Sequence, residues 1–355
     1  MPRAPAAVAT PFLPNWAPGA VAPACYSNAI EEYLAAKVSA GVVDWCNVGR
    51  IRLTGHDGLD LLNRLSTNDL LRLTTGTVAD TVLTTEKGRI VDLLTVHVFD
   101  DHLLVLTSPG NQERVLERIG RFTFSEDVNA IDVTADTGMF SLYGPKAQSM
   151  LETIVGQGFT GLSPGYHALV GIAGTQVTVA LTTPLGGRGF NLVIPGASKD
   201  RVWAAVLDKG QPFGAKPIGT EAFEILRVEA GIPVFGKELD ERFNPIEAGL
   251  ASAISFTKGC YVGQEVIARL NTYQKVQRQL VGLAFDSDLE PRPGSKLLAG
   301  EAEEGLLTSV VMSPALGRPL GLGYVRLPHA KPGSRLLAVA EGRSVRGEVV
   351  VPPVS

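Results

Sequence analysis

Cysteine is scarce in this sequence. Cys25, Cys46 and Cys260 are odd in number and far apart. They therefore form neither a disulfide framework nor a zinc-binding pattern. Because unpaired thiols persist in reducing compartments, we expect a cytoplasmic protein.

Long apolar runs and basic clusters are missing as well. No stretch reaches the roughly 18 apolar residues of a membrane span. Residues 1–26 are rich in Ala and Pro and lack the apolar run of a secretory signal, so we interpret them as an extended N-terminal arm. The formal net charge is -4, and no run of Lys and Arg provides the footprint of a nucleic-acid-binding protein. We expect neither a membrane nor a nucleic acid as partner.

Several catalytic patterns are absent. The histidines lack metal-ligand spacing, so no metal site is expected. The Gly-x-Ser-x-Gly motif of α/β-hydrolases does not occur. The glycine-rich stretch at 185–189 lacks the Lys and the strand-to-helix setting of a P-loop.

What the sequence does contain is typical of a globular protein of two or three domains. Its 355 residues are 45% hydrophobic and 19% charged. A strand that ends in Leu-x-Gly and leads into an apolar helix occurs at 51–65 and again at 140–155, which suggests an internal repeat of two α+β units. The helix predicted at 27–40 has Ile30, Tyr33, Leu34 and Val38 on one face. Further strands are expected at 78–83, 90–98, 103–107 and in two pieces within 181–194, and further helices at 111–119, 199–208 and 220–230.

From residue 280 onward the pattern changes. Short apolar runs alternate with Pro and Gly, and no long helical pattern occurs. This alternation predicts a small all-β barrel or sandwich, so the fold class is α+β with an all-β C-terminal domain. The runs lie at 280–285, 306–312, 320–325, 336–339 and 345–351.

The most distinctive string is Lys-Gly-Cys-Tyr-Val-Gly-Gln-Glu at 258–265. Its glycines permit a sharp turn, and an apolar helical run follows. A thiol just before a helix lies in the positive field of the peptide dipoles, which favours the thiolate, and Lys258 and Arg269 would act in the same direction. Cys260 is therefore either a reactive cysteine or an inert loop cysteine, and spacing alone favours neither.

Two further clusters carry charge in apolar surroundings. Asp92 lies in the apolar strand at 90–98, where an unpaired buried carboxylate is costly, so it either faces solvent or has a function. Arg227 and Glu229 are two residues apart on a helix and do not face each other. Taken alone, this pair indicates a solvated helix end.

Together these segments resemble the aminomethyltransferase (T-protein) superfamily of the glycine cleavage system. The resemblance extends over nearly the whole chain, and its C-terminal part, at 305–314, looks like the barrel domain of that family. The string at 258–265 is similar to the hallmark of the YgfZ branch, which comprises tetrahydrofolate-binding proteins linked to iron–sulfur cluster maintenance. The superfamily motifs are Gly-x-x-x-Asp at 88–92, Leu-Arg-Val-Glu-Ala-Gly-Ile-Pro-Val-Phe-Gly-Lys-Glu-Leu at 226–239 and Asn-Pro-Ile-Glu-Ala-Gly-Leu at 244–250.

The resemblance implies a three-domain T-protein-like arrangement around a central channel, with a C-terminal all-β barrel. After the arm, it implies a first folate-binding α+β domain formed by 27–49 and 138–276. A second α+β domain covers 50–137, and the barrel covers 277–355. The implied ligand is tetrahydrofolate or a one-carbon derivative of it.

Site residues follow from the same resemblance. Asp92 matches an aspartate beside the reacting nitrogens of folate, and Glu229 matches the glutamate that binds the pteridine ring. A carboxylate suits both roles, because it can accept the amide N–H and the exocyclic amine as a bidentate pair or move a proton. The catalytic candidates are Cys260 and Asp92. The candidates for ligand binding are Glu229, Asp92, Arg227, Lys258, Tyr261 and Arg269.

Two positions depart from the T-protein pattern. Leu93 stands where T-proteins have a second aspartate, and the turn at 185–189 replaces their Tyr-Thr-Gly-Glu-x-Gly turn. Both departures weaken the case for aminomethyl transfer and leave folate binding open.

Three functions compete on this basis. The leading hypothesis is a YgfZ-like, tetrahydrofolate-binding protein that supports iron–sulfur cluster assembly or repair through Cys260, with cluster proteins or assembly factors as partners. Because clusters usually take four protein ligands, one cysteine would need further ligands from elsewhere. The alternative is an aminomethyltransferase that transfers a one-carbon unit to tetrahydrofolate. The third is a folate-binding scaffold in which Cys260 is structural.

Overall fold

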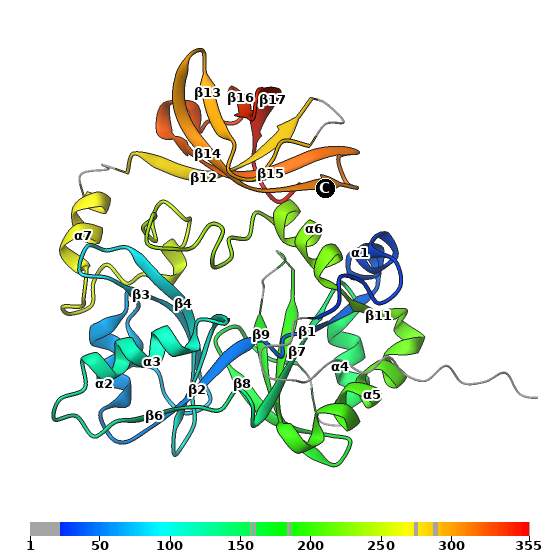
Figure 1. Ribbon diagram of the computed structural model, residues 1–355. Coiled ribbons are helices and arrows are strands. Elements are labelled where there is room, and N and C mark those ends of the chain that lie inside the picture. The colour runs from blue at the N-terminus through cyan, green and yellow to red at the C-terminus, as the bar shows by residue number, and fades with distance from the viewer. Residues whose placement is uncertain are drawn as a thin grey trace, which may run out of the picture.

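Three sheets organise the chain, and they form three lobes (Figure 1). The computed structural model describes residues 22–156, 159, 161–182, 185, 187–272, 276–286 and 290–354. Most of the expected N-terminal arm, residues 1–21, lies outside the described residues. Its last part contacts helix α6 (Thr220–Ala230), because the N–H groups of Thr220 and Glu221 donate to the carbonyls of Pro23 and Ala24.

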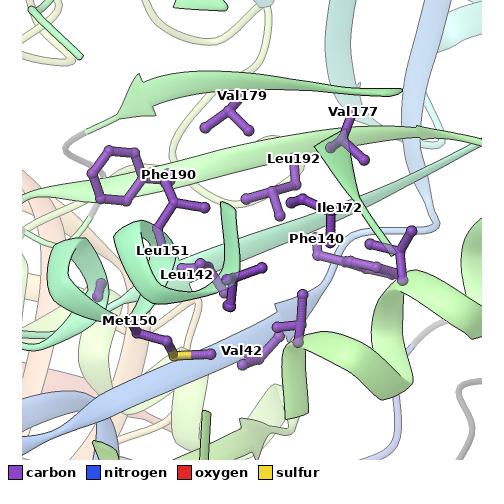
Figure 2. Packing of buried hydrophobic residues seen from close by; sticks show 14 of the residues in the cluster. Val42, Phe140, Leu142, Met150, Leu151, Ile172, Val177, Val179, Phe190 and Leu192 are labelled. Carbon is purple, nitrogen blue, oxygen red and sulfur yellow. The ribbon is translucent and has the colours of Figure 1, made fainter. Parts of the chain in front are cut away.

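The first sheet is buried on both faces. Helices α4 (Ala147–Val155) and α5 (Lys199–Gly210) cover one face, and α1 (Ala29–Val38) and α6 cover the other. Successive residues of a strand point to opposite faces. Leu142 accordingly packs in the α4–α5 core (Figure 2), while Tyr143 packs with α1 and α6. The strand order is β11 (Ala215–Ile218), β1 (Ala40–Asp44), β7 (Thr137–Tyr143), β10 (Gly189–Pro195), β9 (Thr175–Thr182) and β8 (His167–Ile172), with only β11–β1 parallel among these pairs.

The second sheet is antiparallel throughout. Helices α2 (Gly58–Leu65) and α3 (Gln112–Arg121) pack on one of its faces through a core of Leu, Val and Ile side chains. A short turn, η1 (Leu70–Arg72), follows α2. The strand order is β3 (Val78–Thr84), β4 (Ile90–Val98), β5 (Leu103–Pro109), β2 (Val48–Thr54) and β6 (Asn129–Asp132).

The third sheet closes into a barrel with an apolar interior. The α+β class and the C-terminal barrel predicted from the sequence are thereby confirmed. Closure leaves no unpaired edge strand. The barrel order is β12 (Arg278–Phe285), β15 (Arg318–Arg326), β14 (Ala302–Ser313), β13 (Lys296–Ala299), β16 (Arg335–Ala340) and β17 (Arg343–Val350).

A long connection between α6 and α7 (Gln264–Thr272) lies between the barrel and the two open sheets (Figure 1). It contains one short turn, η4 (Ala251–Ala253). Leu239 and Phe243 of the connection pack with Val82 of β3 and Tyr324 of β15, and the rings of Phe243 and Tyr324 stack at 3.6 Å. The connection therefore joins the second sheet to the barrel.

The two strand-to-helix units that suggested a repeat share a backbone device. Gly55, between β2 and α2, has φ 105°, and Gly144, between β7 and α4, has φ 103°. These values lie in the region that favours glycine. A Cβ at Gly55 would lie 2.1 Å from the carbonyl oxygen of Asp127, and one at Gly144 would lie 2.7 Å from that of Ala36. Both turns therefore require glycine, because φ is positive and because a Cβ would clash with a backbone carbonyl.

Some expectations were wrong. The face of α1 expected to be buried is largely exposed, since Ile30, Leu34 and Val38 are 47%, 48% and 63% exposed. Tyr33 of that face is buried, together with Ala35 and Ala36. Five strands, β1, β6, β8, β11 and β13, were not predicted from the sequence.

Among the described residues, none of the helices has both the length and the apolar character needed to cross a membrane.

The first core predicts a large effect of one substitution. Trp203 of α5 is fully buried, with its ring edge-to-face with Phe140 at 5.0 Å. We expect Trp203→Ala to lower the free energy of unfolding by about 3–5 kcal/mol, because the cavity adds to the lost apolar burial. Phe124→Ala is the control, since Phe124 is 86% exposed and such changes stay within about 0.5 kcal/mol. Urea denaturation measures both, and equal midpoints would contradict this assignment.

Candidate functional site

A cavity of about 390 Å³ lies between the first sheet, α1, α6 and the C-terminal segment. Pockets for small molecules usually measure about 300–1,000 Å³, so its volume suits a ligand. Its wall combines apolar side chains with two cations and one carboxylate. The lining residues are Ala36, Lys37, Tyr143, Gly144, Pro145, Gln148, Leu185, Gly187, Arg188, Leu226, Glu229, Ala230, Pro353 and Val354.

Glu229 is the carboxylate of this wall, and it is held in place by donors from two lobes. It lies in the last turn of α6, which ends at Gly231 with φ 74°. Its Oε2 accepts from the Tyr33 hydroxyl at 2.8 Å, and its Oε1 accepts from the Ser313 hydroxyl at 2.6 Å. The Ala315 amide donates to Oε1 at 3.2 Å. A carboxylate accepts about four hydrogen bonds, so these three donors orient Glu229 and leave room for about one more hydrogen bond.

Two cationic side chains, those of Lys37 and Arg188, line the cavity together with Glu229. The Nζ atom of Lys37 lies 3.7 Å from Glu229 Oε2, and its side chain is 38% exposed. Arg188 donates to Gln148 Oε1 at 2.8 Å and to the Leu162 carbonyl at 3.1 Å. The carboxylate at 2% exposure thus faces a wall with two cations.

The structure brings Glu229 together with the turn at 185–189, which replaces the Tyr-Thr-Gly-Glu-x-Gly turn of T-proteins. Leu185, Gly187 and Arg188 of the turn at 185–189 line the same cavity as Glu229. They come from the connection between β9 and β10, about 40 residues before Glu229. Residue 186 of this turn lies outside the described residues. Asp92, Arg227, Lys258, Cys260, Tyr261 and Arg269 do not line this cavity.

Arg227 is completely buried between α6, the connection and the barrel, so the solvated helix end considered from the sequence was wrong. Its Nη1 donates to Glu238 Oε2 at 3.2 Å and to the Ile232 carbonyl at 3.1 Å. Its Nη2 donates to Ser309 Oγ of β14 at 2.6 Å. Its Nε donates to Glu224 at 2.7 Å. These contacts make Arg227 a link between α6 and the barrel, and its expected contact with a ligand stays a prediction.

Asp92 is also fully buried, so the solvent-facing alternative for this residue was wrong. Its carboxylate accepts from the amides of Leu93 at 2.9 Å and Ser108 at 3.0 Å, and it lies beside Asn111, which precedes α3. Leu93 packs instead with the cluster formed by β3, the connection and the barrel. Leu93, which stands where T-proteins have their second aspartate, therefore faces this cluster.

The string at 258–265 is anchored by its lysine and tyrosine. Lys258 donates to the carbonyls of Asn63, Ser66 and Asn68 at and after the end of α2, and burial lowers its pKa to about 8. The Lys258 Nζ atom also lies 5.1 Å from the Tyr261 ring centre. Tyr261 is 8% exposed, and burial raises its pKa to about 12. Both side chains therefore fix the backbone on either side of Cys260.

Cys260 itself is exposed, four residues before α7 begins. In the described part of the chain its sulfur has no hydrogen-bond partner. Arg269 is 62% exposed and pairs with Glu265 at 2.7 Å. The cations expected to favour the thiolate thus bind other groups, and the reactivity of Cys260 stays a prediction.

The residues that position Glu229 could not be identified from the sequence. Tyr33 was assigned to an apolar helix face, and Ser313 was noted only as part of the barrel. Lys37 gave no signal, because a lysine near a helix C-terminus is ordinarily a solvated one. An acidic residue two positions after Arg227 in an apolar helix was the available signal that buried donors must exist elsewhere.

Asp92 gives a prediction about pH. Burial raises its pKa from 3.8 to about 6. Between these values the folded state holds a proton that the unfolded state has released, so the free energy of unfolding falls as the pH rises, by about 3 kcal/mol in total. We expect Asp92→Asn to remove this decrease, as measured by urea denaturation between pH 4 and pH 7. The exposed Asp208→Asn should keep it, and a parallel pH dependence of Asp92→Asn and wild type would contradict the prediction.

Comparison with known proteins follows the division of the fold. Residues 9–258 match the family described as the GCVT N-terminal domain, and residues 278–355 match the glycine cleavage T-protein C-terminal barrel domain. The chain is 31% identical over 341 residues to an aminomethyltransferase of Symbiobacterium thermophilum, with 93% of this chain and 90% of that protein covered. It is 32% identical over 309 residues to a putative chloroplastic transferase of Arabidopsis thaliana, with 87% and 69% covered.

A solved structure shares the fold. The glycine cleavage system aminomethyltransferase T from Bartonella henselae superposes with a TM-score of 0.83 at 21% identity, and 94% of this chain and 91% of that chain are covered. The T-protein-like arrangement implied by the sequence is therefore confirmed at the level of the fold. By its sequence and by its fold, the chain belongs to the GCVT family, the family of the glycine cleavage T-proteins.

Proposed function

We propose that this protein binds tetrahydrofolate in the cavity around Glu229 and transfers a one-carbon unit to it, as an aminomethyltransferase. The observation that carries the proposal is a ligand-sized cavity with the buried carboxylate of Glu229 in its wall. The names of the relatives, aminomethyltransferase in several bacteria, support the reaction type. The GCVT family and the cavity support the ligand.

The cavity residues fit a folate on chemical grounds. A pteridine presents an amide N–H beside an exocyclic amine, and the remaining acceptor position of the Glu229 carboxylate suits one of these donors. Glu229 is fixed by Tyr33 and Ser313 before any ligand arrives, so little ordering remains to be done on binding. Arg188 adds a cation to the wall that suits a carboxylate of the ligand, while Lys37 lies beside Glu229.

The roles assigned here are binding and orientation. Tyr33 and Ser313 hold the Glu229 carboxylate, and the apolar wall of Ala36 and Leu226 excludes water from it. Asp92 accepts backbone amides beside α3 and is not assigned a proton-transfer step. Bound tetrahydrofolate would supply the nitrogens that accept the one-carbon unit.

Glu229→Gln tests the proposal. The substitution removes the charged acceptor, and hydrogen bonds to a charged group contribute about 1.5–3 kcal/mol, so we expect the affinity for tetrahydrofolate to fall roughly 10- to 100-fold. Isothermal titration calorimetry measures it. Glu221→Gln, at an exposed position of the same helix, is the matched control. Unchanged affinity in Glu229→Gln, with an unchanged melting temperature, would place the folate elsewhere.

The reaction itself requires a second assay. Wild-type protein supplied with tetrahydrofolate and an aminomethyl-lipoyl carrier protein should form 5,10-methylenetetrahydrofolate, and Glu229→Gln should form it more slowly at subsaturating folate. Folate binding without any product would retain the ligand and remove the transfer.

A second candidate function is favoured by the presentation of Cys260. Lys258 and Tyr261 anchor the string at 258–265, and Cys260 between them stays exposed. A cysteine fixed at the surface in this way suits exchange with a partner protein. We therefore also propose the YgfZ-like role, in which the protein supports iron–sulfur cluster assembly or repair in the cytoplasm, with cluster proteins or assembly factors as partners.

Cys260→Ala distinguishes this role from folate transfer. We expect the variant to bind tetrahydrofolate with wild-type affinity, since Cys260 does not line the Glu229 cavity, and to lose its support of cluster enzymes in cells. The readout is the activity of cluster-dependent enzymes in a strain that lacks the wild-type protein. Cys25→Ala, at another exposed cysteine, is the control. Full enzyme activity with Cys260→Ala would remove the role.

A further inference from the structure

A second cavity, of about 360 Å³, lies where α7, the β3–β4 turn and the barrel meet. Figure 1 shows α7 beside the β3–β4 hairpin and below β12. The cavity is separate from the one around Glu229, and the two share no lining residue. It is lined by Lys87, Arg89, Asn244, Glu247, Val266, Leu270, Gln277, Arg278 and Arg326.

Its charge is strongly unbalanced. Four cations, Lys87, Arg89, Arg278 and Arg326, face one carboxylate, that of Glu247. The formal sum is therefore +3, in a chain whose formal net charge is -4. A hollow lined mainly by charge of one sign focuses the field and concentrates counter-ions.

The single carboxylate, that of Glu247, is already paired with two of these cations. Glu247 is 8% exposed, and it lies 3.1 Å from Arg278 Nε and 3.7 Å from Arg89 Nη1. Its other hydrogen bond comes from the amide of Asn244. The guanidiniums of Arg89 and Arg278 also both donate to the Arg242 carbonyl, at 3.1 and 2.6 Å. These contacts fix the two guanidiniums side by side and leave several of their N–H groups for a ligand.

The other cations have weak partners or none. Arg326 is 64% exposed and lies 3.9 Å from Glu304, a distance at which a surface pair contributes little. Lys87 has neither an ion pair nor a hydrogen bond with any residue that the structure describes. Arg278 and Arg326 are also direct cross-strand neighbours in the register of β12 and β15. Like charges placed opposite each other on paired strands destabilise a sheet, so an anion between them would relieve a built-in repulsion.

We propose that this junction binds a small molecule that carries two or more oxyanion groups. Guanidiniums form bidentate pairs with carboxylates and phosphates alike, so the shared chemistry is a clustered negative charge and not one functional group. Val266 and Leu270 of α7 provide an apolar wall on one side. The site would join the second sheet to the barrel through the ligand, and it does not depend on the function proposed for the Glu229 cavity.

Calorimetric titration of the full-length protein at low ionic strength tests the proposal, with pyrophosphate and citrate as separate probes and acetate as a monoanion. We expect saturable binding of at least one of the two multiply charged probes, weaker binding of acetate, and an affinity that falls as sodium chloride is added. Pyrophosphate alone would indicate phosphates, and citrate alone would indicate carboxylates.

The double variant Lys87→Gln, Arg326→Gln should weaken binding by roughly tenfold or more. Both side chains are exposed and weakly bonded, so the fold should survive, which the melting temperature checks. The matched control is Lys331→Gln, Arg335→Gln, which removes the same charges from exposed positions outside the cavity. The proposal is overturned if neither pyrophosphate nor citrate binds saturably to wild type, or if the two double variants bind equally well.

Discussion

The buried ion pair between Arg227 and Glu238 fixes α6 against the barrel, and the cavity around Glu229 depends on that position. Both side chains are inaccessible to solvent. Glu238 also accepts from the hydroxyls of Thr308 and Ser309. A buried pair repays its desolvation only when its remaining hydrogen-bonding groups are satisfied, and here the barrel satisfies them. The pair thus specifies how α6 of the first lobe packs against the barrel.

One short stretch of α6 contacts the barrel through Arg227 and lines the cavity through Glu229, because of the periodicity of the helix. Residues two apart on an α-helix point about 200° away from each other. Arg227 therefore reaches the connection and β14, while Glu229 reaches Tyr33 of α1 and Ser313 at the end of β14. The position of the Glu229 carboxylate therefore depends on the buried arginine of the same helix. The shape of the cavity around Glu229 depends in the same way on how α6 packs against the barrel.

Local patterns in the sequence predicted the helices and the barrel, and long-range contacts explain what they could not predict. Helix α6 was expected at 220–230 because Gly231 ends a periodic run, and the structure confirms it. The burial of Glu229 depends on Tyr33, 196 residues away, and on Ser313, 84 residues away, and no local pattern reports such partners. The face of the sheet toward which Asp92 points could not be predicted either. The alternation of side chains along a strand is compatible with both faces, and the register of β3 and β4 shifts near this residue. Strands such as β11 escaped because Ala-Lys-Pro-Ile is short and not particularly β-prone.

The wall of the Glu229 cavity includes Pro353 and Val354, and the Val354 amide donates to the Glu229 carbonyl at 2.9 Å. Ala36 of α1, early in the chain, lines the same cavity. The first sheet and α6 alone leave this side of the cavity open. Docking of residues 353 and 354 on α6 completes the wall, so the cavity forms only when segments more than 300 residues apart come together.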